Sequence, residues 1–258
     1  MAGIPELNSS LYRRMRFCVG DPTAYVELPR VDGGFESTLI LRDIEMDRAK
    51  IKARADRVAC PKDFEPQGGL SGDRETATAQ AAAECFLRTG VKCVIADRTL
   101  PLIYHEMLRR AGIAVECDTE FGVVERRQKD EQEIEWIHEA QSVTHWVMRR
   151  ACETVAKAKA AADGILHHGG EALTAVRLRA MIDHWLLDRG FANPPAIVAP
   201  GIEGADCHNY GEGPIHTGEP VIIDIFPMSR ATRYNGDCTR TVVHGDIPDR
   251  VAKMHAAV

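Results

Sequence analysis

The sequence predicts two unlike domains: a small α/β layer, and a second domain built around a long helix and a strand hairpin. In the first half, short β-branched runs alternate with helical segments. A charged run near the middle interrupts this pattern, and a long helical periodicity follows it. With 258 residues, 45% of them hydrophobic and 27% charged, the chain can bury one large core or two modest ones.

The charge pattern argues against two classes of partner. The net charge is −6, and no long Lys/Arg run is present. The sequence therefore shows no cluster of positive charge that would bind nucleic acid or an anionic membrane. The N-terminus lacks the apolar stretch of a secretory signal, and no segment approaches the roughly 18 apolar residues of a spanning helix. We therefore expect a cytoplasmic protein with no nucleic-acid or membrane partner.

The eight cysteines form no CxxC pair. They are scattered along the chain at Cys18, Cys60, Cys85, Cys93, Cys117, Cys152, Cys207 and Cys238. In a chain of this size, scattered cysteines favour reduced and mostly buried thiols over disulfides or a zinc cluster.

The elements of the first domain follow from its apolar runs. Predicted strands lie at 38–42, 93–96 and 113–116. Predicted helices lie at 75–89 and 100–111, with Gly90 and Gly112 at their ends. The charged run at 124–133 marks the boundary, so the predicted domains are 1–125 and 126–258.

The second domain opens with a long amphipathic helix. From Glu133 onward apolar residues recur at helical spacing, and we interpret this stripe as packing. A second helix is predicted at 171–189, closed by Gly190, and a strand at 196–199 follows it.

Residues 218–245 carry the most informative pattern. Two strand-like runs, 220–226 and 237–243, flank a turn-rich middle and predict a hairpin. If the turn centres between Arg230 and Ala231, Asp224 faces Asp237 with Cβ atoms about 5 Å apart. Burying an unpaired carboxylate among apolar side chains is costly, and two facing carboxylates repel. A divalent cation such as Mn²⁺ between them would remove both problems.

Two alternatives remain open at this stage. In an ordinary hairpin, Asp224 would accept from turn amides and Asp237 would pair with Arg233 or Arg240. A tight turn at Asn235-Gly236 would break the predicted register altogether. We interpret this dipeptide as a bulge or bend that leads into Asp237.

Three segments resemble the signature of the pita-bread metallopeptidases, the group of methionine aminopeptidase, prolidase, Xaa-Pro aminopeptidase and creatinase. These segments are IIDIFP, YNGDCTRT and the preceding DCHNYGEGPIHTGEP. Residues 126–147 resemble the helix that opens the family's catalytic domain, and residues 1–125 resemble the creatinase-type N-terminal domain of its longer members. The resemblance implies an α/β creatinase-like domain followed by an incomplete α+β pita-bread domain.

The resemblance also implies roles for three residues. Asp224 would ligate one metal, Asp237 would bridge two, and His208 would contact substrate and help to move a proton. Considered alone, His208 would be an ordinary loop histidine. Only the presence of both aspartates in the same pattern assigns it the substrate-contact and proton-transfer role. The implied cofactors are two divalent ions, with Mn²⁺ favoured and Co, Zn or Fe open.

The chain departs from the family pattern in two ways. The interval from Asp224 to Asp237 is longer than usual, which fits an enlarged loop at 228–232. The family completes its site with a later His and two later Glu, whereas residues 249–258 resemble the start of the next helix. Neither Glu219 nor His255 lies in a segment that matches the missing motifs. We therefore expect a C-terminally truncated chain with half a site and little or no activity.

For the complete protein, the resemblance implies metal-dependent hydrolysis of peptides with proline after the first residue. A non-peptidase enzyme of the same fold, lyase-like or creatinase-like, is one alternative. A catalytically inactive binding module is another. The expected partner is a peptide or small-molecule substrate, and a homodimer is possible because relatives commonly dimerise.

Overall fold

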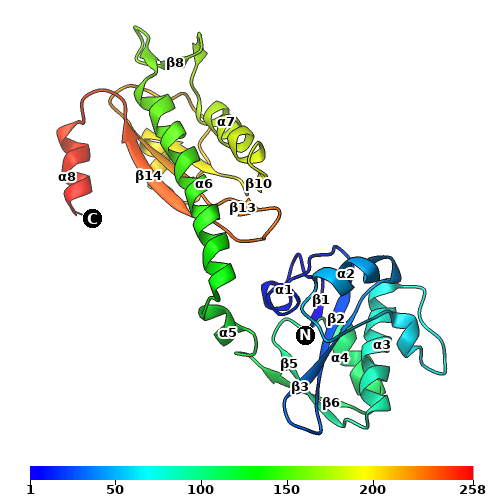
Figure 1. The fold of residues 1–258 in the computed structure, drawn as a ribbon. Helices are drawn as coiled ribbons and strands as arrows, with labels where there is room; N and C mark the ends of the chain where they lie inside the picture. The colour runs from blue at the N-terminus through cyan, green and yellow to red at the C-terminus, as the bar shows by residue number, and fades with distance from the viewer. Residues whose placement is uncertain (258) are drawn as a thin grey trace. The chain divides into compact units, whose positions relative to one another are not determined.

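A computed structural model describes residues 1–257 and is drawn in Figure 1. The chain divides into two compact units, Met1–Lys129 and Asp130–Val258. The division falls inside the charged run at 124–133. Each unit is described below by itself.

The first unit contains a four-stranded sheet in the order β1-β2-β3-β4. Its strands are β1 (Ala2–Gly3), β2 (Thr23–Pro29), β3 (Phe35–Ile40) and β4 (Arg57–Ala59). β2 and β3 are antiparallel, whereas β3 and β4 are parallel. A separate parallel pair joins β5 (Cys93–Asp97) to β6 (Ala114–Asp118), so all three predicted strand regions of this unit are confirmed.

Five α-helices belong to the first unit. They are α1 (Ser9–Met15), α2 (Met46–Lys52), α3 (Arg74–Arg88), α4 (Leu102–Arg110) and α5 (Val123–Arg127). Short 3₁₀ turns lie at Asp43–Glu45 and Pro61–Phe64. The two predicted helices correspond to α3 and α4, and Gly90 and Gly112 follow them with φ near 74°.

The second unit is organised by α6 (Glu131–Ala156), α7 (Ala175–Leu187) and α8 (Asp249–Ala257). α6 begins with a capping box in which Asp130 accepts from the Glu133 amide and Glu133 accepts from the Asp130 amide. α7 is shorter than predicted, because the Thr174 hydroxyl caps the Arg177 amide and starts the helix at Ala175. Glu171–Ala172 is the short strand β9.

Three small sheets complete the second unit. β11 (Ile197–Pro200), β12 (Pro220–Ile225) and β14 (Cys238–Val243) form an antiparallel sheet in the order β11-β12-β14. β10 (Phe191–Ala192) pairs with β13 (Met228–Ser229), and β8 (Leu166–His168) pairs with both β7 (Lys159–Ala160) and β9. The predicted strand at 196–199 and the predicted hairpin are confirmed as β11 and as β12 with β14.

One face of the β11-β12-β14 sheet packs on helices. Its core joins apolar residues of α6 and α7 to alternate residues of the strands, which include Val198, Val221, Ile223, Ile225 and Cys238. The apolar stripe of α6 is therefore packing, as predicted. The helices occupy one face of the sheet, so the other face is available to polar side chains.

The cysteines correct one prediction. All eight are free, but only Cys85 and Cys238 are buried, and Cys93, Cys117 and Cys207 are exposed. The prediction of mostly buried thiols was wrong, because Cys93 and Cys117 lie on a two-stranded pair with little cover. None of the helices in residues 1–257 is long and apolar enough to cross a membrane.

Candidate metal centre

The two predicted metal ligands lie on β12 and at the start of β14. Along β12, Val221, Ile223 and Ile225 are buried, whereas Ile222 and Asp224 are only partly buried. This alternation turns the Asp224 side chain away from the helices, to the other face of the sheet. Asp237 is exposed and immediately precedes β14.

The register of the hairpin differs from the prediction. Asp224 pairs with Thr239, and Ile225 pairs with Cys238, so Asp237 is not directly opposite Asp224. Because side chains alternate along a strand, Asp237 and Thr239 share a face. Asp237 is therefore the diagonal neighbour of Asp224, at a separation of about 7–8 Å rather than about 5 Å.

The turn explains the shift. The ladder continues beyond the strands, since the Gly236 amide donates to the Pro227 carbonyl at 3.0 Å and the Ser229 amide donates to the Tyr234 carbonyl at 2.9 Å. Arg233 closes the turn in a left-handed conformation, with φ of 65°. The turn thus centres one residue later than predicted, and this displaces every cross-strand partner by two residues.

A hydroxyl group positions the first carboxylate. Thr239 Oγ1 donates a hydrogen bond to Asp224 Oδ1 at 2.6 Å. Arg240, one of the proposed partners of Asp237, instead donates from Nη1 to the Thr239 carbonyl at 2.7 Å. Within residues 1–257 neither carboxylate forms an ion pair, so both keep oxygens for a cation.

The backbone of Asp237 is fixed by α6. Gln141 Oε1 accepts from the Asp237 amide at 3.1 Å, and Gln141 Nε2 donates to the Asp237 carbonyl at 2.9 Å. This two-point contact sets the start of β14 on the helix. Gln141 was not among the predicted site residues, because its partner is 96 positions away in the sequence.

Gly236 allows this close approach. A Cβ atom at Gly236 would lie 2.0 Å from Thr144 Oγ1 and 2.7 Å from the Ala140 carbonyl oxygen of α6. The Asn-Gly dipeptide is therefore no tight turn, and it packs against the helix just before Asp237. Tyr234 holds the hairpin tip to the same helix, with its hydroxyl on Glu133 and its ring 5.4 Å from that of Trp136.

The charges of both carboxylates act on the thiol of Cys238, which lies on the other face of β14 from Asp237 and Thr239. Burial raises the pKa of its thiol, and the charges of Asp237 and Asp224 raise it further, against the opposing effect of Arg240. Both carboxylates therefore raise the pKa of the same thiol, although they are not cross-strand partners.

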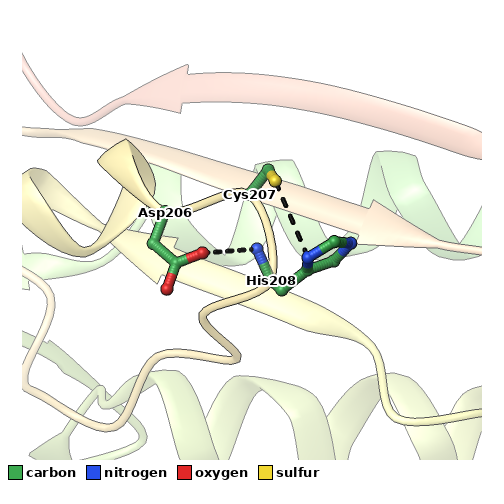
Figure 2. Close-up of side chains that lie close together, drawn as sticks. All are labelled: Asp206, Cys207 and His208. Atoms are coloured by element: carbon green, nitrogen blue, oxygen red, sulfur yellow. Dashed lines mark hydrogen bonds between the residues drawn. The ribbon is translucent and has the colours of Figure 1, made fainter.

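His208 lies in the loop after the 3₁₀ turn η3 (Gly201–Ala205). Figure 2 shows it with Asp206 and Cys207, its two preceding neighbours. The His208 amide donates to Asp206 Oδ1 at 2.9 Å, and Cys207 Sγ lies 3.8 Å from His208 Nδ1. All three residues are exposed, and their potential ligand atoms lie within 4.8 Å of one another.

This group of carboxylate, thiol and imidazole was not predicted from the sequence. The adjacency of Asp206, Cys207 and His208 is the signal that could have identified it. Thiol and imidazole ligands favour softer ions such as Zn²⁺, whereas Asp224 and Asp237 offer only oxygens. No other set of three potential ligands gathers in the described part of the chain.

Among residues 1–257, the hydrogen bonds of His208 go to Asp206 and Cys207, and none joins it to Asp224 or Asp237. The structure places η3 over the same face of the sheet, because a Cβ atom at Gly204 would lie 2.9 Å from Ile222 Cδ1. Ile222 precedes Asp224 by two positions and shares its face. The substrate-contact role of His208 stays a prediction.

The donor set fits a hard divalent cation in part. Two carboxylates on one face supply oxygen ligands, and a bound cation would offset their mutual repulsion. Two donors are fewer than the four or so ligands of a typical closed protein metal site. Asp224 and Asp237 are thus two of the donors that a metal centre here would need, and their role as ligands stays a prediction.

Comparison with known protein families gives a match over the part of the chain that contains Asp224 and Asp237. Residues 146–258 match the model of metallopeptidase family M24. A comparison with curated proteins finds no significant match.

Solved structures match over nearly the whole chain at low identity. A prolidase from Pyrococcus horikoshii is 19% identical with a TM-score of 0.70, over 100% of this chain and 63% of that one. An X-Pro aminopeptidase from Thermotoga maritima is 17% identical with a TM-score of 0.74, over 100% and 65%. A Xaa-Pro dipeptidase from Bacillus anthracis is 17% identical with a TM-score of 0.74, over 97% and 62%.

These matches establish the fold over the part that the chain spans. The chain covers less than two thirds of each of these structures. The predicted pita-bread architecture, incomplete in this chain, is confirmed.

Proposed function

We propose that the protein hydrolyses peptides with divalent metal ions, on the premise that residues 146–258 match the model of metallopeptidase family M24. One observation carries the proposal: Asp224 and Asp237 lie as diagonal neighbours on the exposed face of a sheet whose other face is packed on helices. Hard divalent cations bind such oxygen ligands.

The residues around the pair have separate tasks. Asp224 and Asp237 hold the ions, Thr239 orients the Asp224 carboxylate, and Gln141 fixes the backbone of Asp237. When bound, the ions supply an activated water and polarise the peptide carbonyl. His208 contacts the substrate and moves a proton to or from the reacting group.

The substrate class is an inference from relatives. Solved structures that share the fold are a prolidase, an X-Pro aminopeptidase and a Xaa-Pro dipeptidase. We assign peptides with proline after the first residue to this protein by that likeness. Mn²⁺ is the favoured ion, with Co, Zn or Fe as alternatives.

We further propose that the protein is cytoplasmic and that it assembles as a homodimer.

The 258-residue chain is expected to be a poor catalyst. Its two carboxylates hold a divalent ion weakly, and they leave a bound water without the further ligands that position it. This same shortage of donors favours a second candidate, a binding module that recognises a peptide without cleaving it.

A peptidase assay separates these functions. The 258-residue chain and the product of any longer reading frame that contains it, called here the complete product, are each incubated with Mn²⁺ and a set of Xaa-Pro dipeptides, beside dipeptides without proline. The proposal predicts cleavage of Xaa-Pro peptides by the complete product, lost with Asp237→Ala, and little or none by this chain. Peptide binding without cleavage by the complete product supports the module, and activity only on non-peptide substrates supports a lyase-like or creatinase-like enzyme.

A further inference from the structure

Asp206, Cys207 and His208 form a group of potential metal ligands that is separate from the carboxylate pair on β12 and β14. One ligand atom from each residue lies within 4.8 Å of the other two: a carboxylate oxygen, a thiol sulfur and an imidazole nitrogen. We call residues 206–208 the ligand turn. This mixed donor set differs in chemistry from two carboxylates, so it favours a different ion.

A tight turn brings the three ligand atoms together. The Asn209 amide donates to the Asp206 carbonyl at 3.1 Å, which closes a turn of four residues. Within this turn the His208 amide donates to Asp206 Oδ1 at 2.9 Å, so the carboxylate folds back over the backbone. Neighbouring side chains of an extended strand point to opposite faces. The turn instead gathers the side chains of three consecutive residues, as Figure 2 shows.

The spacing of sulfur and nitrogen suits a tetrahedral ion. Cys207 Sγ lies 3.8 Å from His208 Nδ1. Bonds of about 2.3 Å to sulfur and about 2.0–2.1 Å to nitrogen, at a tetrahedral angle, would place these two atoms about 3.5 Å apart. A small rotation of either side chain closes this difference. All three side chains are exposed, so such a rotation meets little steric resistance, and the Asp206 carboxylate can follow.

The segments on both sides of the ligand turn are held by the rest of the second unit. Before it, η3 lies against β12 at Gly204. After it, Arg179 of α7 donates from Nη1 to the carbonyls of Tyr210 and Gly211. The Val198 amide of β11 also donates to the Tyr210 carbonyl, at 3.2 Å. Ligands on a loop that is already held lose less conformational entropy when they bind an ion.

The donor types indicate zinc. Thiolate and imidazole are common ligands of Zn²⁺, whereas Mg²⁺ and Mn²⁺ prefer oxygen ligands. Three protein ligands leave the fourth position of a tetrahedral ion open. The sulfur binds as the thiolate, so its proton passes to the solvent when the ion binds.

We propose that Asp206, Cys207 and His208 bind one Zn²⁺ ion, with a water molecule or a small anion in the fourth position. The protein ligands are the Asp206 carboxylate, the Cys207 thiolate and His208 Nδ1. The site rests on the ligand turn alone and does not depend on the proposed hydrolysis. One consequence does rest on that function: Zn²⁺ at this site withdraws His208 Nδ1 from the substrate.

Titration of the full chain with Co²⁺, under a phosphine reductant, tests the proposal. Co²⁺ occupies tetrahedral zinc sites, and a cobalt–thiolate bond gives an absorption band in the near ultraviolet. We expect this band to saturate at one Co²⁺ per chain and to disappear when Zn²⁺ displaces the cobalt. The absence of the band, or a band that Zn²⁺ leaves unchanged, would overturn the proposal.

Variants of the ligand turn test the assignment of each ligand. Cys207→Ser should abolish the cobalt–thiolate band, and Asp206→Asn should weaken Zn²⁺ binding by at least about tenfold in calorimetry. Cys117→Ser, the matched control at another exposed thiol, should change neither result. A band that survives in Cys207→Ser, a band that is lost equally in Cys117→Ser, or unchanged Zn²⁺ affinity in Asp206→Asn would contradict the site. Circular dichroism establishes that each variant is folded.

Asp237→Ala separates this site from the carboxylate pair. The variant keeps all three residues of the ligand turn, so the cobalt–thiolate band and the Zn²⁺ affinity should stay unchanged, whatever happens to Mn²⁺ binding. Loss of the band in folded Asp237→Ala would show that the ion needs the carboxylate pair, and it would refute a separate site at residues 206–208.

Discussion

Asp224 faces Thr239 across the β12–β14 ladder, and it meets Asp237 only on the diagonal. The hydroxyl of Thr239 thus lies on the same face as both carboxylates and donates to Asp224 Oδ1 at 2.6 Å. A diagonal pair leaves more room between the carboxylates than a directly facing pair. That room is compatible with more than one cation between them.

Gln141→Ala tests how the start of β14 is held. The substitution removes both hydrogen bonds to the Asp237 backbone, and the expected loss is about 1–2 kcal/mol in the free energy of unfolding. Mn²⁺ affinity should also fall, because Asp237 is then free to shift. Urea unfolding and calorimetry measure the two effects. Gln132→Ala on the exposed side of α6 is the matched control, and equal behaviour of the two variants would contradict this role of Gln141.

Gly236→Ala tests the close packing of the hairpin on α6. The new Cβ atom would meet Thr144 Oγ1 at 2.0 Å and the Ala140 carbonyl oxygen at 2.7 Å. We expect a loss of about 1–3 kcal/mol in the free energy of unfolding, because the strand or the helix must move. Gly213→Ala in the same unit meets only Glu203 Oε1, at 3.4 Å, and should be near neutral in urea unfolding. A stability for Gly236→Ala close to that of Gly213→Ala would disprove the packing argument.

The thiols should fall into classes of reactivity with a chromogenic disulfide reagent. Exposed Cys117 and Cys207 should react fast, and buried Cys85 and Cys238 should react only on unfolding. Cys93 should react more slowly than other exposed thiols at neutral pH, because desolvation and the neighbouring Glu116 raise its pKa. Single Cys→Ser variants assign each phase. A rapid phase that persists with unchanged amplitude in Cys207→Ser would show that Cys207 does not contribute to it.

The acid stability of the first unit should depend in part on Glu106. Hydrogen bonds from Arg109 and Arg110 lower the pKa of its carboxyl to about 2, from an ordinary value of 4.5. A lowered folded-state pKa stabilises the folded state above the ordinary value, and this stabilisation is lost as the pH falls toward about 2. The melting temperature of Glu106→Gln should therefore lie below that of the unmodified chain at neutral pH, and the difference should shrink in acid and in high salt. A difference that grows in acid would contradict the lowered pKa.

The sequence predicted the elements that depend on local signals. The stripe that begins near Glu133 predicted α6, and the glycines at 90 and 112 predicted the ends of α3 and α4, because periodicity and helix ends are short-range properties. The choice of Asp224 and Asp237 came from a pattern of strands and from a resemblance, and the structure places them on one face of one sheet.

The remaining features depend on contacts that local patterns do not encode. The register followed from the left-handed conformation of Arg233, a single turn residue that displaces every cross-strand partner by two positions. Gln141 meets Asp237 across 96 positions, and the Ser10 hydroxyl donates to the Gly122 carbonyl across 112 positions. Such long-range contacts form only when the whole unit folds.

Titration of Mn²⁺ into the 258-residue chain, beside Asp224→Ala and Asp237→Ala, tests the central claim most directly. Mn²⁺ is preferred to Zn²⁺ because the thiol and imidazole of Cys207 and His208 would take the softer ion. The account predicts weak Mn²⁺ binding that either substitution abolishes, while Asp246→Ala, an exposed loop carboxylate, leaves it intact. Mn²⁺ binding of the same strength in all four proteins, or in none, would contradict a metal centre at Asp224 and Asp237.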